Sequence, residues 1–217
     1  MWSEMFDLFL TSFNETLVMV GISGVVGALF GIPLGVLLHL TDRGGVLAHP
    51  LFNRSIGVIV NAVRSVPFII LLVVVIPFTR FIVGSSIGTT AAVVPLTIAA
   101  IPFIARLVES ALREVDRGLV EAAQSMGATT GQIVWKVLLP EAMPGIVAAL
   151  TITFVSLVGY SAMAGAIGGG GLGDLGIRYG YQRYITEVMV AVVVILIVLV
   201  QAAQSFGDWL VRRISHR

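Results

Sequence analysis

The sequence predicts an all-α membrane protein with five transmembrane helices and a short helical segment on the cytoplasmic side. Its 217 residues are 57% hydrophobic and 12% charged, with a mean hydropathy of +1.01, which is too apolar for a soluble domain. Charge-free runs of membrane-spanning length recur along the chain, and one polar segment, residues 118–140, interrupts them. We expect residues 1–217 to form a single transmembrane domain.

The five expected spans are about residues 16–41, 57–83, 89–112, 144–167 and 188–206. The first is a run of 26 residues without a charge. As a helix it would be about 39 Å long, so it would cross a hydrocarbon core of about 30 Å with a tilt. Within it, small residues recur every four positions and form one stripe, Ser23, Gly27, Gly31 and Gly35. Such a stripe predicts close approach of a second helix.

Prolines and paired charges mark the next two spans. Pro67 and Pro77 lie inside the second span and predict kinks there. Near the end of the third span, Glu109 and Arg113 are four residues apart, which predicts a helical ion pair at the membrane interface. After the fourth span, the glycine-rich run 168–173 is expected to be a loop.

The fourth span is the best candidate for the lining of a pathway across the membrane. Tyr160 and Ser161 offer hydrogen bonds there, Ser156 lies one turn before Tyr160, and Met163 offers a flexible apolar plug. The alternative is plain helix packing through small residues, with Tyr160 closing an interface. The sequence alone leaves both open.

The polar segment 118–140 is expected to form two short helices that meet at a bend. Residues 118–126 have helical apolar spacing, and Gly127 can take the positive φ that ends a helix. Thr129 and Gln132 have the capping-box spacing that begins a second helix, and Pro140 stops it or starts the next element. The segment either inserts into a partner or rests on lipid headgroups as an amphipathic loop.

The distribution of positive charge orients the chain. With the C-terminus inside, the cytoplasmic side would hold ten basic residues: Arg43, Arg54, Arg64, Arg106, Arg113, Arg117, Lys136, Arg212, Arg213 and Arg217. Only three would lie outside: Arg80, Arg178 and Arg183. This bias predicts a periplasmic N-terminus, a cytoplasmic C-terminus and a cytoplasmic segment 118–140.

The sequence contains no recognisable catalytic or nucleotide-binding motif. It has no Walker A pattern, so we expect no ATP hydrolysis by this chain, and no zinc-protease or serine-hydrolase motif. Its three histidines are scattered, its cysteine count is zero, and no basic patch suggests nucleic acid. We expect no catalytic residue, metal or bound cofactor. The lack of carboxylate pairs in the spans weakens an ion-coupled transporter, and Ser161 lacks a base for hydrolase chemistry.

The polar segment resembles the EAA motif of ABC-importer permeases, the binding-protein-dependent inner-membrane components. The residues that carry the likeness are Glu121, Ala122, Ala123, Gly127, Ile133, Leu139 and Pro140. The resemblance implies that these residues form coupling helices that dock on a cytoplasmic ATPase. Because each chain has one such segment and these ATPases work in pairs, it also implies a homodimer.

A narrower resemblance covers about residues 57–184 and points to the permeases of methionine importers. It is carried by the stretches 61–72, 76–80, 126–129, 159–163 and 170–173. It implies a bacterial inner-membrane protein that imports methionine with a MetQ-like substrate-binding protein. A pair of MetN-like ATPase subunits would bind the ATP and Mg. Alternatives are a permease of the same architecture for another amino acid or small peptide, and an ion-coupled secondary transporter.

Overall fold

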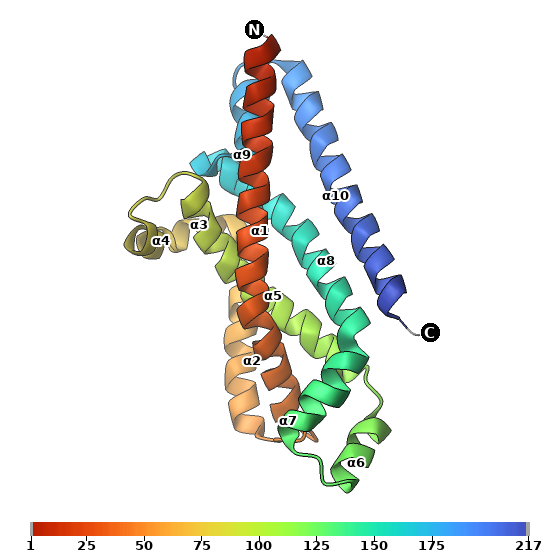
Figure 1. The fold of residues 1–217 in the computed structure, drawn as a ribbon. Coiled ribbons are helices and arrows are strands. Elements are labelled where there is room, and N and C mark those ends of the chain that lie inside the picture. The colour runs from red at the N-terminus through yellow and green to blue at the C-terminus, as the bar shows by residue number, and fades with distance from the viewer. Residues whose placement is uncertain (1, 216–217) are drawn as a thin grey trace.

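The chain is a bundle of long helices with short helices at both ends (Figure 1). A computed structural model describes residues 2–215, and the side chains of residues 5–215. Arg217, counted above among the cytoplasmic charges, lies outside the described residues, as do both chain ends. The helices are α1 (Trp2–Thr41), α2 (Pro50–Ser65), α3 (Phe68–Val74), α4 (Ile76–Val83), α5 (Thr89–Arg113), α6 (Arg117–Ser125), α7 (Thr130–Ile133), α8 (Leu139–Ala164), α9 (Gly171–Leu175) and α10 (Thr186–Ile214), with π-helical stretches η1 (Val134–Leu138), η2 (Gly165–Gly169) and η3 (Gly176–Tyr181).

Four helices in the described part of the chain are long and apolar enough to cross a membrane: Met5–Thr41, Thr89–Arg113, Thr130–Gly169 and Thr186–Ile214. The bent pair of α2 and α3 adds a fifth if it counts as one span. No β-strand occurs among residues 2–215. The predicted all-α, five-span class is therefore confirmed.

Helix α1 starts well before the expected span. It has 40 residues, which at about 1.5 Å per residue is about twice the thickness of a hydrocarbon core. Residues 2–15 contain neither proline nor glycine, so nothing in the backbone ends the helix where charges begin. Its first turns therefore extend past the apolar run that the sequence marks.

The glycine stripe of α1 packs against α5, as predicted. A Cβ on Gly27 would lie 2.7 Å from Cβ of Ala100, and one on Gly35 would lie 2.6 Å from the carbonyl oxygen of Ala105. The Ser23 hydroxyl of α1 donates to the carbonyl oxygen of Val93, which also lies on α5. The backbones of α1 and α5 therefore approach each other closely. Helix α5 lies at the centre of the bundle, with α1 and α8 beside it (Figure 1).

The second expected span is broken rather than kinked. Helices α2 and α3 make an angle of 103° at Val66 and Pro67, and α4 follows after one more break. Pro67 is the N-cap of α3 and Pro77 lies in the first turn of α4. Each proline lacks a backbone N–H, so each is accommodated where a helix begins and not inside one.

The glycine-rich run after α8 is only partly a loop. Gly168 and Gly170 have φ of 93° and 78°, which ends η2, but α9 begins at Gly171. A carboxylate oxygen of Glu15 accepts from the Gly171 N–H at 2.7 Å, and the Thr16 hydroxyl accepts from the Leu172 N–H at 2.9 Å. The expectation that residues 168–173 are all loop is therefore wrong, because α1 supplies the acceptors that cap a short helix there.

We expect Gly31→Ile to destabilise the bundle by about 1–3 kcal/mol, the usual range for overpacking. A Cβ on Gly31 would lie 2.8 Å from Cβ of Ile104 and 2.9 Å from the carbonyl oxygen of Ile101. The measurement is the midpoint of thermal unfolding of the purified protein in detergent. Gly21→Ile is the matched control, because no atom lies within 4 Å of a Cβ there. Equal midpoints for both variants would contradict the packing described here.

Candidate functional site

The segment between α5 and α8, residues 117–138, is hereafter the α6–α7 segment. It projects from one end of the bundle, opposite the end where α9 meets the start of α10 (Figure 1). Three residues connect it to α5, and a carboxylate oxygen of Asp116 accepts from the Gly118 N–H at 2.6 Å to cap α6. The short connector and the cap fix where α6 begins.

A glycine and a capping box make the bend between α6 and α7. Gly127 has φ 77°, so the predicted positive φ is confirmed. The Thr129 N–H donates to Oε1 of Gln132 at 2.8 Å, and the Gln132 N–H donates to Oγ1 of Thr129 at 3.4 Å. This confirms the capping box. The bend is therefore set by local backbone chemistry.

The second helix does not end at Pro140. It runs from α7 through η1 into α8, so the segment is continuous with a membrane-crossing helix. Pro140 lies in the first turn of α8, directly after the π-helical stretch η1. A π-turn displaces the backbone hydrogen bonds locally, which lets the helix pass a residue that has no N–H to donate.

One face of the α6–α7 segment is anchored in the main apolar core. Ala123, Ile133 and Leu138 are buried and belong to the same cluster as Leu112 of α5 and Ala142 of α8. The segment is thus attached to the bundle through side chains from both of its helices.

The opposite face of the segment is exposed. Glu121, Ala122 and Pro140 are exposed, and Leu139 is half-buried. Met126 and Trp135 are 81% and 74% exposed, although both are large and apolar. Sequence reasoning did not single out Trp135. Its signal was available, since Trp135 lies two residues from both Ile133 and Val137, and therefore off their apolar stripe.

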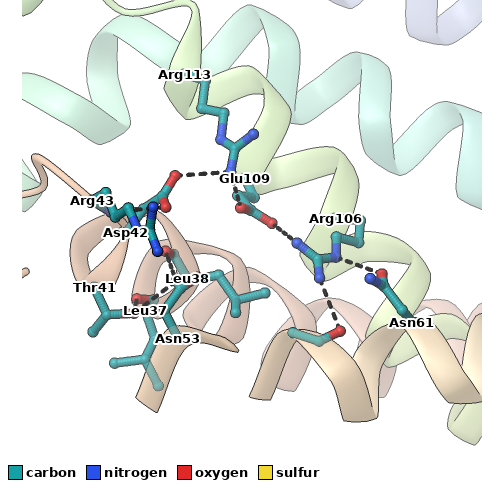
Figure 2. A network of polar contacts seen from close by, with 11 residues as sticks. Leu37, Leu38, Thr41, Asp42, Arg43, Asn53, Asn61, Arg106, Glu109 and Arg113 are labelled. Carbon is teal, nitrogen blue, oxygen red and sulfur yellow. Dashed lines mark hydrogen bonds and ion pairs between the residues drawn. The ribbon is translucent and has the colours of Figure 1, made fainter. Parts of the chain in front are cut away.

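A buried carboxylate connects the end of α5 to α1 and α2 (Figure 2). The Glu109 side chain is 4% exposed, and its two oxygens accept from Arg106 at 2.6 Å and from Arg113 at 2.7 Å. Arg113 also pairs with Asp42 in the α1–α2 loop at 2.9 Å. The predicted Glu109–Arg113 pair is confirmed as the centre of a larger network.

Arg106 carries the network to α2. It donates to Oδ1 of Asn61 at 3.1 Å and to the carbonyl oxygen of Gly57 at 3.0 Å. Both acceptors lie on α2, while Arg106 and Glu109 lie on α5. The network therefore joins α5 to α2 and to the α1–α2 loop, at the end of α5 from which the α6–α7 segment continues.

The candidate pathway residues on α8 do not share one environment. Tyr160 is half-buried and stacks on Phe68 of α3, with ring centroids 4.6 Å apart and ring planes 8° from parallel. Met163 is 47% exposed. The hydroxyls of Ser156 and Ser161 donate to the carbonyl oxygens of Ile152 and Val158 in their own helix, and Ser161 is buried. Two of the four candidates, Ser156 and Ser161, therefore have their hydroxyls engaged within α8.

The described residues hold no cluster of three or more histidine, cysteine or acidic side chains that could bind a metal ion. The architecture is that of a helical membrane protein with a short helical segment exposed at one end and no nucleotide-binding motif in its sequence. The chain belongs to the family described as binding-protein-dependent transport system inner membrane component, whose profile matches residues 31–216.

Close relatives have one shared description. A probable D-methionine transport system permease protein MetI of Vibrio cholerae is 63% identical over 211 residues, covering 97% of this chain and 94% of that protein. The D-methionine transport system permease protein MetI of Escherichia coli is 60% identical over 151 residues, 70% of each chain.

Solved structures agree with this kinship. A chain of the MetNI methionine ABC transporter in an inward-facing conformation is 54% identical, with a TM-score of 0.97, covering 98% of this chain and 99% of that one. A chain of an amino acid ABC transporter is 23% identical with a TM-score of 0.78, which shows the shared fold.

We expect Glu109→Ala to lower the stability of the bundle by about 3 kcal/mol, the lower end for breaking a buried ion pair, because Arg113 still reaches solvent. The variant leaves Arg106 and Arg113 without their shared carboxylate. Thermal unfolding in detergent measures the loss. Glu114→Ala is the matched control, because Glu114 is exposed and takes no part in the ion pairs of residues 5–215. A Glu109→Ala midpoint equal to that of the control would contradict the role of the network.

Proposed function

We propose that this chain is the permease subunit of an ATP-driven importer for methionine, including its D form. The observation that carries the proposal is the 63% identity to a probable D-methionine permease over nearly the whole of both chains. The likeness to a MetNI transporter chain, with a TM-score of 0.97, supports the same assignment.

The permease supplies the route through the membrane, and a separate ATPase supplies the energy. The α6–α7 segment docks on that ATPase through its exposed face, to which Glu121, Ala122 and Gly127 of the coupling motif belong. The other motif residues support that face: Ala123 and Ile133 anchor the segment in the core, and Leu139 and Pro140 begin α8. The anchored face supports this role, because a segment packed on the core transmits a displacement to the helix bundle better than a mobile loop does. Two copies of the chain pair with two ATPase subunits, which bind the ATP and Mg, and a binding protein delivers the amino acid.

The α6–α7 end faces the cytoplasm, and the end formed by α9 and the start of α10 faces the periplasm. The excess of arginine and lysine near the α6–α7 end supports this orientation in a bacterial inner membrane. The route itself runs along α8, where Tyr160 and Met163 face it, while the hydroxyls of Ser156 and Ser161 bond to carbonyl oxygens of α8 itself.

The direct test is uptake by proteoliposomes that contain the permease, its ATPase and its binding protein. We expect labelled methionine to accumulate only with ATP on the ATPase side, and other amino acids to compete poorly. Equal uptake of an unrelated amino acid would reassign the substrate. Uptake driven by an ion gradient without ATP would overturn the class.

The proposed orientation in the membrane can be tested with single introduced cysteines, because the chain has no native cysteine. Gln182 is exposed before α10 and Ser215 follows α10. Gln182→Cys should react with an impermeant thiol reagent from the periplasmic side of intact cells, whereas Ser215→Cys should react only after the membrane is opened. Reaction of both cysteines in intact cells would contradict the orientation.

Gly127→Val should uncouple the permease from its ATPase without unfolding it. A β-branched residue at φ 77° is strained by about 1–2 kcal/mol, but no atom lies within 4 Å of a Cβ at Gly127, so the strain stays local. We expect normal abundance in the membrane, weaker retention of the ATPase during purification and reduced uptake.

Gly127→Asn is the matched control, since asparagine tolerates positive φ better than other residues. It should keep most of the uptake and of the bound ATPase. If Gly127→Val imports methionine as well as Gly127→Asn does, the bend does not shape the docking surface.

A further inference from the structure

We propose that a groove between α2, α5 and the α1–α2 loop binds the phosphate of an anionic membrane lipid. The groove lies beside the Glu109 network, at the same end of the bundle as the α6–α7 segment (Figure 1). Arg43 and Arg54 supply positive charge there, and Arg106 and Asn61 supply hydrogen-bond donors. The inference does not depend on which substrate the chain transports.

The groove is large enough for a headgroup. Its volume is about 310 Å³, and the residues that line it come from the α1–α2 loop, from α2 and from α5. Small-molecule sites in proteins span about 300–1,000 Å³. Gly57 has no side chain to fill the groove, and a Cβ there would lie 3.0 Å from Nη2 of Arg106. The glycine therefore lets Arg106 of α5 reach α2 and line the groove.

Two positive charges at the groove have no carboxylate partner among the described residues. The ion pairs of residues 5–215 include neither Arg43 nor Arg54, and both side chains are exposed. The one acidic residue that lines the groove, Asp42, pairs with Arg113 at 2.9 Å. The third lining arginine is balanced by Glu109 at 2.6 Å. The charge that remains is positive and favours an anion.

The groove also presents hydrogen-bond donors in fixed positions. Arg106 is held at both ends of its guanidinium, because three of its five N–H groups donate to Glu109, Asn61 and Gly57. Two N–H groups remain for a ligand. Oδ1 of Asn61 is occupied by Arg106, and no hydrogen bond of residues 5–215 uses its amide N–H groups. Several donors without a free acceptor match the oxygens of a phosphate.

Apolar side chains beside the groove favour a lipid over a soluble phosphate. Val58 lines the groove and is exposed, and so is its neighbour Ile59. Arg54 lies one turn before Val58, so a charged and an apolar side chain share one face of α2. A soluble ion would contact only the charged part, whereas an acyl chain would also cover the apolar part. Basic pockets between membrane helices are known sites for anionic headgroups.

Native mass spectrometry of the purified permease in detergent tests the inference. Phosphatidylglycerol should bind several-fold more tightly than phosphatidylethanolamine, whose ammonium group offsets the phosphate charge, and an equal concentration of inorganic phosphate should not displace it. Arg43→Gln combined with Arg54→Gln should weaken phosphatidylglycerol binding by about fivefold for each arginine, or about 25-fold in total. The corresponding pair of lysine substitutions keeps both charges and should retain most of the binding.

Arg212→Gln combined with Arg213→Gln is the matched control. It removes two exposed arginines from the end of α10, outside the groove, and should bind phosphatidylglycerol like the wild type. Thermal unfolding in detergent gives a second measurement. Phosphatidylglycerol should raise the midpoint of the wild type but not that of the Arg43→Gln/Arg54→Gln variant, and the two midpoints should agree without lipid because both arginines are exposed.

Equal phosphatidylglycerol binding by the wild type and the Arg43→Gln/Arg54→Gln variant would overturn the inference. So would an equal loss in the α10 control, because affinity would then follow total charge and not the groove. Displacement by inorganic phosphate would assign the groove to a soluble anion instead. A groove variant that binds the lipid normally but loses the ATPase during purification would assign the arginines to a protein contact. None of these outcomes depends on methionine import, so they leave the proposed function to its own test.

Discussion

The buried carboxylate of Glu109 holds the α6–α7 end of the molecule together. A charge removed from water is unfavourable unless partners compensate it, and Arg106 and Arg113 do so at 2.6 and 2.7 Å. Through those arginines, α5 is tied to Asp42 in the α1–α2 loop and to Asn61 on α2 (Figure 2). The α6–α7 segment starts a few residues beyond Arg113 and is packed on the same core. In the proposed function, a displacement of that segment would therefore be passed to α5, to α2 and to the α1–α2 loop.

Short-range chemistry was predictable from the sequence. Gly127, the capping box at Thr129 and the Glu109–Arg113 pair depend on residues no more than four positions apart, and the structure has all three. The glycine stripe of α1 was predictable for a related reason, since helical periodicity places small residues on one face whatever packs there. Five membrane elements followed from apolar length.

Long-range chemistry was not predictable in the same way. Asp42 joins Arg113 across 71 residues, and Glu15 caps α9 across 156 residues, so neither contact leaves a local pattern. Prolines at 67 and 77 indicated a change of direction, but the angle of 103° is set by the packing of α3 beside α5 and α8. Tyr160 was a candidate for the pathway by its type, and only the structure brings the ring of Phe68 against it.

In the proposed transporter, the α6–α7 segment and the Glu109 network move as one body when the ATPase binds and hydrolyses ATP. The most direct test is double electron–electron resonance between spin labels at Ser125→Cys in α6 and Ser55→Cys in α2. The complexes should contain one labelled and one unlabelled copy of the permease, so that only the distance within one copy is measured. We predict a single narrow distance that is the same in the nucleotide-free and ATP-trapped transporter. A broad distribution, or a shift of several ångströms on trapping ATP, would show that the segment flexes on its own and would contradict the claim.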